Sequence, residues 1–265
     1  MRHSLRTAFI IIVVLSTLVL CKKQTETVND FQKIIESDTL RVLTLNTSTS
    51  YFIYREQEMG YQYDMIKSFA DEKGLILKIV TAKNSVGLFN KLQNNEGDII
   101  AYGMPIENEM KDVLFYCGLS EISHQVLIQR AERSDTVLKD VTELIGKDIY
   151  VTRGSKYDNR LNNLNRELGG GINIKHLDKD TIVVEAEDNV ARLNQTYFLN
   201  IDIGMQISFD QRTSWAVRKD TPVLADSLNA WYERVHKESD YLRLAKRYFE
   251  ESKGFTNPYE FYTVG

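Results

Sequence analysis

The first part of the chain alternates short apolar runs with segments of helical spacing. Apolar runs over residues 40–45, 75–80 and 98–103 predict strands, the second of them of the buried type. The segments between them, 61–73 and 86–93, carry apolar side chains at helical spacing, which is typical of helices that pack on a sheet. Strands that alternate with helices in this way predict a parallel α/β lobe that binds its ligand beyond the carboxyl ends of the strands.

The two helices of this part have recognisable ends and buried positions. Gly60 precedes the first helix, and Gly74 closes it as a left-handed C-terminal cap. The second helix ends near Gly97 and is predicted to bury Phe89 and Leu92.

The second part of the chain predicts a smaller lobe. A strand over residues 126–129 leads out of the first lobe, and a charged linker follows over 131–140. The second lobe begins with a strand over residues 148–152 and a helix that ends at the glycine triplet 169–171. Amphipathic helices within residues 224–249 are predicted to return to the first lobe.

Five stretches resemble a known family. They are Gly-Tyr-Gln-Tyr-Asp-Met at 60–65, Gly-Asp-Ile-Ile-Ala-Tyr-Gly-Met at 97–104, Ser-His-Gln-Val-Leu-Ile at 123–128, Glu-Asp-Asn-Val-Ala-Arg-Leu-Asn at 187–194, and Ser-Phe-Asp-Gln-Arg-Thr-Ser-Trp-Ala-Val-Arg-Lys at 208–219. In this order they resemble the family 3 extracellular solute-binding proteins, and most closely the N-terminal binding module of the membrane-bound lytic transglycosylases of type F. The resemblance implies a two-lobed α/β fold of the periplasmic-binding-protein type II, with a shortened second lobe.

The expected division of the chain follows from these patterns together. It has a lipoprotein signal peptide at 1–20, a tether at 21–38, lobe 1 at 39–129, lobe 2 at 130–212, a return to lobe 1 at 213–250 and an aromatic tail at 251–265.

Lobe 2 departs from the family pattern. Only residues 178–180 separate the predicted strands 172–177 and 181–186, where the family has a helix. Parallel neighbours need a crossover of a dozen or more residues, so the two strands should form a hairpin. The missing helix would leave an apolar face open, which predicts a looser lobe 2 and weak ligand binding.

The N-terminus predicts export and a lipid anchor. Arg2 and Arg6 precede an apolar run over residues 8–20, which is too short to span a membrane but has the length of a secretory signal. Cys21 follows as the expected lipidation site, although Leu20 departs from the small residue usual there. The alternative is an uncleaved signal anchor with an incidental cysteine. Lipidation of Cys21 would leave Cys117 alone, and we interpret Cys117 as a small buried apolar residue.

The resemblance places the ligand between the lobes. A hydroxyl-rich turn follows the first strand, Ser155 opens a helix whose amides suit an anion, and Glu187 matches the family residue that takes a ligand ammonium. Ser155 could instead be only a helix cap, and Glu187 only a solvated loop carboxylate. The candidate ligand-binding residues are Thr47, Ser50, Tyr51, Tyr63, Asp64, Gly103, Met104, Gln125, Ser155, Lys156, Glu187 and Arg212.

The arginine that holds a ligand carboxylate in the amino-acid binders of this family is missing. Glu107 and Met110 stand where the hydroxyl residue and that arginine would be. A desolvated carboxylate without a partner costs several kilocalories per mole. A simple α-amino acid is therefore disfavoured unless Arg153, Lys156 or Arg212 substitutes.

Catalysis, metal binding and nucleic-acid binding have little support in the sequence. Lytic transglycosylases need a glutamate in a helical domain that follows the binding module, and we interpret Glu238-Ser239 as a surface dipeptide. The histidines lack metal-ligand spacing, and we expect no cofactor and no metal. Basic residues are scattered and the net charge is −4, which argues against nucleic acid. A hydrophobic fraction of 43% and a charged fraction of 26% exclude disorder.

The function expected from these observations is that of an envelope-anchored solute-binding lipoprotein. It would face the periplasm from the outer membrane and sense a muropeptide-like peptidoglycan fragment between its lobes. One alternative is the substrate-binding receptor of an ABC transporter for a small polar solute, with a permease as partner. Another is the truncated N-terminal part of a lytic transglycosylase.

Overall fold

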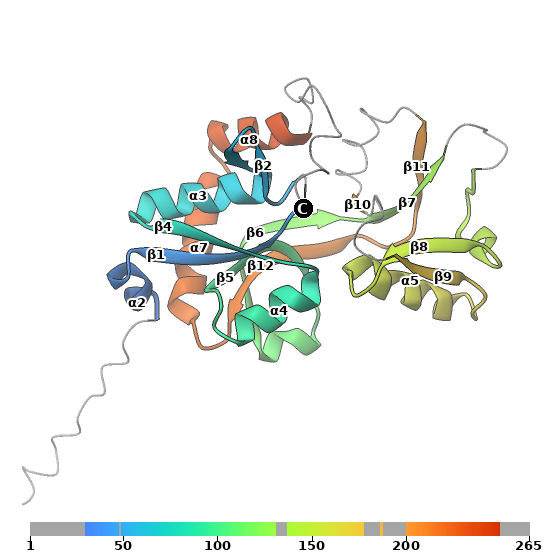
Figure 1. Cartoon of the computed structure of the whole chain (residues 1–265), viewed down its shortest axis with the longest axis horizontal. Helices are drawn as coiled ribbons and strands as arrows, with labels where there is room; N and C mark the ends of the chain where they lie inside the picture. The colour runs from blue at the N-terminus through green and yellow to red at the C-terminus, as the bar shows by residue number, and fades with distance from the viewer. Residues whose placement is uncertain (1–29, 48, 131–136, 178–185, 188–199, 250–265) are drawn as a thin grey trace, which may run out of the picture.

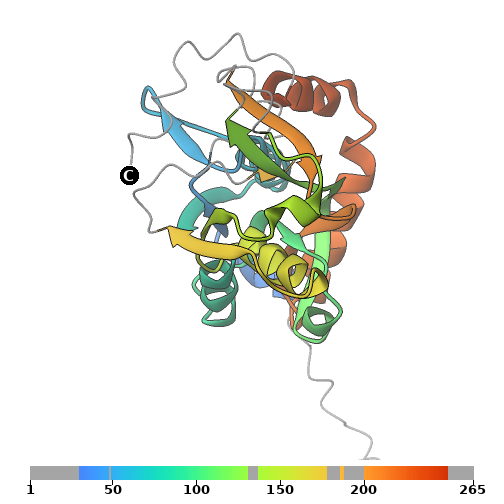
Figure 2. The ribbon, with the colours of Figure 1, turned by 90° about the vertical axis from the view of Figure 1, so that its right-hand side faces the viewer.

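The chain folds into two lobes of unequal size that are joined by crossing strands (Figure 1). The computed structural model describes residues 30–47, 49–130, 137–177, 186–187 and 200–249. The predicted two-lobed α/β fold is confirmed. The larger lobe 1 holds both the first and the last helix of this part of the chain, and the smaller lobe 2 lies beyond the crossing strands (Figures 1 and 2).

Lobe 1 is built on a five-stranded mixed sheet. Its strands lie in the order β4 (Ile76–Ala82), β1 (Thr39–Leu45), β5 (Ile99–Pro105), β12 (Gln211–Arg218) and β6 (Leu114–Ser123). β1 is parallel to β4 and β5, whereas β12 is antiparallel to β5 and β6. Because β12 comes late in the chain yet lies between two early strands, lobe 1 cannot be completed until the chain has returned from lobe 2.

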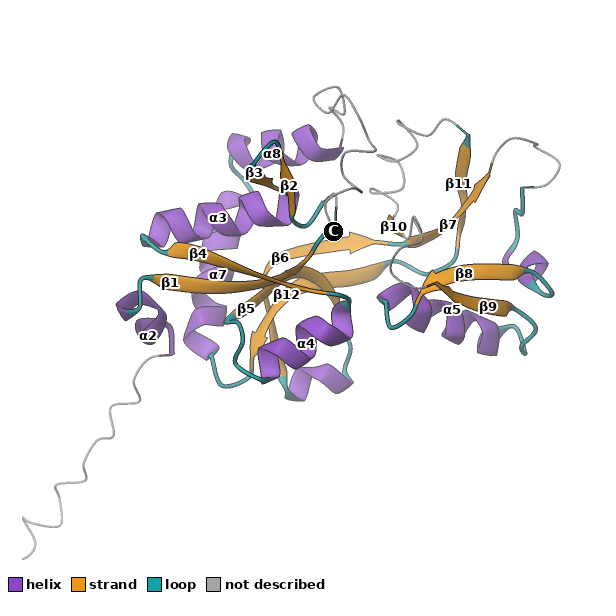
Figure 3. Ribbon diagram, viewed as in Figure 1, coloured by secondary structure: helices purple, strands orange, loops and turns teal. Residues whose placement is uncertain are grey.

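Helices cover both faces of this sheet (Figure 3). One face packs against α2 (Asp30–Glu36), α3 (Tyr61–Lys73), α7 (Pro222–Val235) and α8 (Ser239–Phe249). The other face packs against α4 (Ser85–Gln93), whose Leu88 and Leu92 are fully buried. The predicted helices of lobe 1, including the two that return to it, are therefore confirmed.

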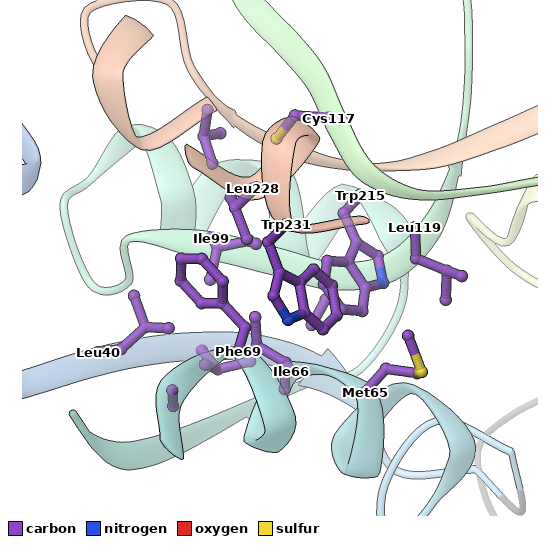
Figure 4. Close-up of a cluster of buried hydrophobic side chains, with 14 of the residues drawn as sticks. Leu40, Met65, Ile66, Phe69, Ile99, Cys117, Leu119, Trp215, Leu228 and Trp231 are labelled. Atoms are coloured by element: carbon purple, nitrogen blue, oxygen red, sulfur yellow. The ribbon is translucent and has the colours of Figure 1, made fainter. Parts of the chain in front are cut away.

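The larger core centres on two tryptophans (Figure 4). Trp215 of β12 and Trp231 of α7 stack with ring centroids 6.1 Å apart, and Phe69 of α3 packs edge-on against Trp231. The Trp215 indole nitrogen donates a hydrogen bond to the side-chain oxygen of Gln62 at 2.5 Å. Cys117 lies in the same core, and burial raises the pKa of its thiol to about 12, as its interpretation as a small apolar residue implies.

Two details of lobe 1 differ from the sequence-based expectations. The strand expected to be of the buried type is β4, which lies at the sheet edge, and its Ile76 is 67% exposed. In α4, Leu88 is fully buried while Phe89 is only partly buried. An apolar composition predicts a strand, but it does not show whether the strand pairs with one neighbouring strand, at the sheet edge, or with two.

The end of the stretch assigned to the tether is helical. Residues 30–36 form α2, whose Ile34 packs into the core of lobe 1. The Asp30 carboxylate accepts hydrogen bonds from the backbone amides of Val223 and Leu224, at 3.2 and 3.1 Å. These amides open α7, so a side chain 193 positions before Val223 caps that helix.

The described part of lobe 2 contains a small parallel sheet and the helix α5. Strands β8 (Asp148–Thr152) and β9 (Asn173–Leu177) pair in parallel and are connected by α5 (Lys156–Glu167). The short 3-10 helix η2 (Val141–Leu144) closes the core, in which Leu144, Val151, Leu161 and Met205 are buried. The predicted strand and helix of this lobe are confirmed.

The crossing between the lobes uses a second small sheet. Strand β7 (Gln125–Arg130) pairs antiparallel with β11 (Ile201–Gln206) and with the two residues of β10 (Ala186–Glu187). The expected hairpin and the open face depend on residues 178–185, which lie outside the described part of the chain. Both stay predictions.

Candidate functional site

Among the described residues, Asn84 and Tyr102 of lobe 1 lie against Arg153, Gly154 and Lys156 of lobe 2, and we call these five residues the interlobe seam. Asn84 opens α4 in lobe 1, and its amide nitrogen donates a hydrogen bond to the backbone oxygen of Arg153 in lobe 2 at 3.4 Å. The Lys156 ammonium nitrogen of lobe 2 lies 5.3 Å from the ring centroid of Tyr102, the central residue of β5. The seam therefore brings the carboxyl end of the lobe 1 sheet against the turn that opens α5.

The loop after β1 is held by hydrogen bonds within the loop and to the start of α3. Ser50 donates its amide hydrogen to the Thr47 hydroxyl oxygen at 3.1 Å, and its carbonyl accepts from the Tyr63 amide at 3.0 Å. Gly60 lies so close that a Cβ there would stand 2.3 Å from the Ser50 carbonyl oxygen. The loop that carries Thr47 and Ser50 is thus fixed to the start of α3.

Two candidate tyrosines share one carboxylate. Glu58 lies on the hairpin of β2 (Phe52–Tyr54) and β3 (Gln57–Met59), and it accepts hydrogen bonds from the hydroxyls of Tyr51 at 2.7 Å and Tyr63 at 3.0 Å. The two rings lie 5.5 Å apart. Burial, and then the Glu58 carboxylate, raise the pKa of Tyr51 to about 12. Both hydroxyls are therefore protonated donors at neutral pH, held in place by Glu58.

Asp64 is held by the last helix. Its carboxylate accepts a hydrogen bond at 2.7 Å from the Tyr248 hydroxyl, which itself accepts from the Gly60 amide at 3.0 Å. Burial raises the pKa of Asp64, and the hydrogen bond from Tyr248 only partly offsets this. Tyr248 therefore connects α8 to the first turn of α3.

Gly103 and Met104 lie where β5 passes β12. A Cβ on Gly103 would stand 3.0 Å from the Thr213 hydroxyl oxygen, so the glycine allows the close approach of the two strands. Met104 is buried in the smaller core of lobe 1 with Leu114 and Ala216. Met110, at the position of the missing arginine, packs partly buried against the same core from the 3-10 helix η1 (Glu109–Asp112).

The start of α5 in lobe 2 is capped from within. Ser155 is the N-cap, and its hydroxyl oxygen accepts from the Asp158 amide at 3.1 Å. The Asp158 carboxylate accepts in turn from the Gly154 amide at 2.9 Å and lies 2.9 Å from the His176 ring nitrogen. Burial alone would raise the pKa of Asp158, but the Gly154 amide, His176 and Asn162 outweigh it and lower the pKa. Two of the amides that could face an anion are thus already occupied.

Replacing Asp158 by asparagine is expected to destabilise lobe 2 in a pH-dependent way. A carboxyl group whose pKa is lowered by folding stabilises the fold above its unfolded pKa, about 4, and this stabilisation is lost as the pH falls through the folded pKa. The difference in urea midpoint between the wild type and Asp158→Asn should therefore be largest at pH 7 and shrink below about pH 4. A difference that is constant with pH would contradict this role.

Gln125 lies fully buried at the crossing. Its backbone amide donates a hydrogen bond to the Ser208 hydroxyl oxygen at 2.8 Å, and its side-chain nitrogen donates to the side-chain oxygen of Gln211 at 3.2 Å. Its side-chain oxygen has no hydrogen-bond partner in the described part of the chain. The backbone of Glu187 pairs with that of Gln125, whereas the side chain of Glu187 is outside the description. Arg212, on β12, is exposed.

The candidate residues thus fall into separate groups, and the structure adds partners that sequence reasoning missed. Asn84, Tyr102, Glu58 and Asp158 were not among the candidates, although an asparagine two residues before the predicted helix 86–93 is a capping signal. Cys21 lies outside the described residues. Within the described ranges, no three His, Cys, Asp or Glu side chains gather as metal ligands would, and no helix is long and apolar enough to cross a membrane.

A family model decides the relationship. Residues 40–251 match the model of the bacterial extracellular solute-binding proteins, family 3. The chain belongs to this family. The resemblance drawn from the five sequence stretches is therefore confirmed for this family 3 protein.

Curated relatives of this family 3 protein carry the name membrane-bound lytic murein transglycosylase F. The protein from Pseudomonas fluorescens (strain Pf0-1) is 29% identical over 239 residues, which cover 83% of this chain and 48% of the relative. The one from Desulfosudis oleivorans is 29% identical over 234 residues, covering 82% and 50%. The chain therefore spans about half the length of the curated relatives it matches.

Solved structures with the same fold include binding proteins. A mutant of ArgBP from T. maritima aligns with a TM-score of 0.72 at 23% identity, covering 83% of this chain and 99% of that one. The cysteine-binding protein from Campylobacter jejuni aligns with a TM-score of 0.73 at 12% identity, covering 84% and 94%. At these identities the likeness establishes the fold of this family 3 protein and leaves its ligand open.

Proposed function

We propose that this family 3 protein is an envelope-anchored lipoprotein that binds a muropeptide-like peptidoglycan fragment between its lobes and performs no chemistry on it. The similarity to the transglycosylase F relatives over most of the chain carries the proposal. Lipidation at Cys21 and a periplasm-facing position at the outer membrane belong to it. The proposal includes the division of the chain into lobe 1 at 39–129, lobe 2 at 130–212 and a return to lobe 1 at 213–250, and ligand contacts by the twelve candidate residues.

The chemistry of the site supports a ligand other than a simple α-amino acid. Met110 packs against the core where the family places its carboxylate-binding arginine. In lobe 2, the Asp158 carboxylate already accepts a hydrogen bond from the Gly154 amide. This negative charge at the start of α5 would repel an anionic ligand group bound nearby. The tyrosines on Glu58 and the hydroxyl-bearing loop before them offer neutral donors, which suit the hydroxyls and amides of a glycopeptide.

A transport receptor for a small polar solute is the second candidate function. The solved structures of this fold include arginine-bound ArgBP and a cysteine-binding protein, whose names state such ligands. A third candidate is a part of a lytic transglycosylase, because the chain spans about half of those relatives. Permease genes beside the coding sequence would favour the second candidate, and an in-frame helical domain with a Glu-Ser dipeptide would favour the third.

Thermal stabilisation by a purified muropeptide tests the proposed ligand. A ligand present at 100 times its dissociation constant stabilises the folded state by about 2.7 kcal/mol, which is a shift of several degrees for a chain of this size. We expect this shift with muropeptides and none with free amino acids. The exposed Arg212 is a candidate contact, so Arg212→Gln should reduce the shift, whereas the matched change Lys78→Gln on the exposed edge strand β4 should not. Stabilisation by amino acids alone would refute the proposal.

A further inference from the structure

One buried cation of this protein bridges its two lobes. Lys156 is 8% exposed although lysine is rarely buried, and it is the first residue of α5 in lobe 2. Its ammonium nitrogen lies 5.3 Å from the ring centroid of Tyr102 in lobe 1 and 5.3 Å from that of Tyr157 in its own lobe. An ammonium over the face of an aromatic ring is attracted by the ring quadrupole, and the attraction grows when water is excluded.

The contact lies beside two candidate site residues. Tyr102 is the central residue of β5, three positions before the strand's carboxyl end, and Gly103 and Met104 follow it directly. Ligands of open α/β sheets bind beyond such strand ends. The turn over Arg153 and Gly154, which precedes Lys156, is held against Asn84 of lobe 1 by the hydrogen bond to the Arg153 carbonyl. The two contacts together fix the stem of Lys156 so that it points across the seam.

We propose that Lys156 is a tethered cation that holds the lobes together without a solute and occupies the place where a cationic solute would bind. The proposal deepens the proposed function, since it assumes that the space between the lobes is the solute site. It assigns the ligand class: the solute carries no cationic group near Tyr102. A solute with a guanidinium or ammonium group at this place would have to displace the Lys156 ammonium from the ring.

Lobe closure in the absence of any solute tests the first half of the proposal. Lys156→Met keeps an unbranched apolar stem and removes the charge, while Lys156→Arg keeps the charge. Small-angle X-ray scattering of the full chain measures the radius of gyration, which rises when the lobes separate. The ratio of closed to open molecules should fall about fivefold to thirtyfold for Lys156→Met and stay near the wild-type value for Lys156→Arg. Equal scattering of wild type and Lys156→Met would overturn the proposal.

A double substitution ties the effect to the aromatic ring. Tyr102→Leu should open the lobes to a similar extent, and combining it with Lys156→Met should add little, because both remove one interaction. Fully additive effects would show that the two side chains act separately and would contradict the proposed contact.

Free L-arginine tests the second half. The wild type should show no thermal shift and no change in scattering with millimolar L-arginine. A shift together with a decrease in the radius of gyration would show that a guanidinium is accepted, and would overturn the assignment of ligand class. Failure of muropeptides to bind would refute the proposed function but leave the scattering of the ligand-free variants unchanged, so the two failures are distinguishable.

Discussion

Replacing Trp215 by alanine is expected to lower the free energy of unfolding by about 3–5 kcal/mol, the range typical of a buried aromatic residue. Trp215 is fully buried between the sheet and α7, where it stacks on Trp231 (Figure 4). The substitution leaves a cavity in the largest core and removes the hydrogen bond to the buried Gln62 side chain. Urea unfolding followed by circular dichroism measures the loss.

Trp215→Phe separates the two contributions. Phenylalanine restores much of the ring but cannot donate to Gln62, so its cost should be smaller than that of alanine and should reflect mainly the unpaired amide, about 1–3 kcal/mol. Phenylalanine and alanine variants of equal stability would contradict the cavity argument.

Replacing Gly60 by alanine is expected to destabilise the fold by about 2–5 kcal/mol and to displace the loop of Thr47 and Ser50. Its backbone has φ of 141°, which L side chains rarely adopt, and the new Cβ would stand 2.3 Å from the Ser50 carbonyl oxygen. A carbonyl of the main chain cannot turn aside as a flexible side chain can, so the loop itself must move. Urea unfolding measures the stability, and hydrogen exchange of the Ser50 and Tyr63 amides reports the displacement.

Gly74→Ala is the matched control for this substitution. Gly74 also has a positive φ, 68°, but a Cβ there would meet nothing within 4 Å. It should therefore cost only the conformational strain, about 1–2 kcal/mol, and leave the Ser50 amide protected. If both variants lost the same stability, the contact with Ser50 would have no energetic weight.

The sequence patterns predicted the helices and strands of lobe 1 well because each of these elements depends mainly on residues that are close together in sequence. Helix α3 follows from apolar residues at helical spacing and from Gly74, whose left-handed cap is present as expected. The place of β4 at the sheet edge and the insertion of β12 between β5 and β6 depend on pairings between residues far apart in sequence. Helix α2 was missed because it is short and its stability comes from packing and from capping α7, neither of which leaves a periodic signal.

The candidate site could be placed only in outline. The sequence indicated the right segments, but it could not state which polar groups would satisfy one another. Ser155 was weighed as an anion site or a cap, and the structure shows it capping α5. The roles of Glu58 and Asp158 require contacts made by side chains whose partners lie on other turns or strands, and such pairs have no signature in a single sequence.

Tyr248 connects α8, the last described helix, to Gly60 and Asp64 at the start of α3. Its hydroxyl joins the Gly60 amide to the Asp64 carboxylate, and Tyr61 between them packs against both Tyr248 and Phe249. A rotation of α8 would therefore displace Gly60 through the Tyr248 hydroxyl, and Gly60 lies directly against Ser50 of the loop after β1. In mechanical terms α8 is a lever against the start of α3, and we expect a displacement of α8 to shift the loop that carries the candidate residues Thr47 and Ser50.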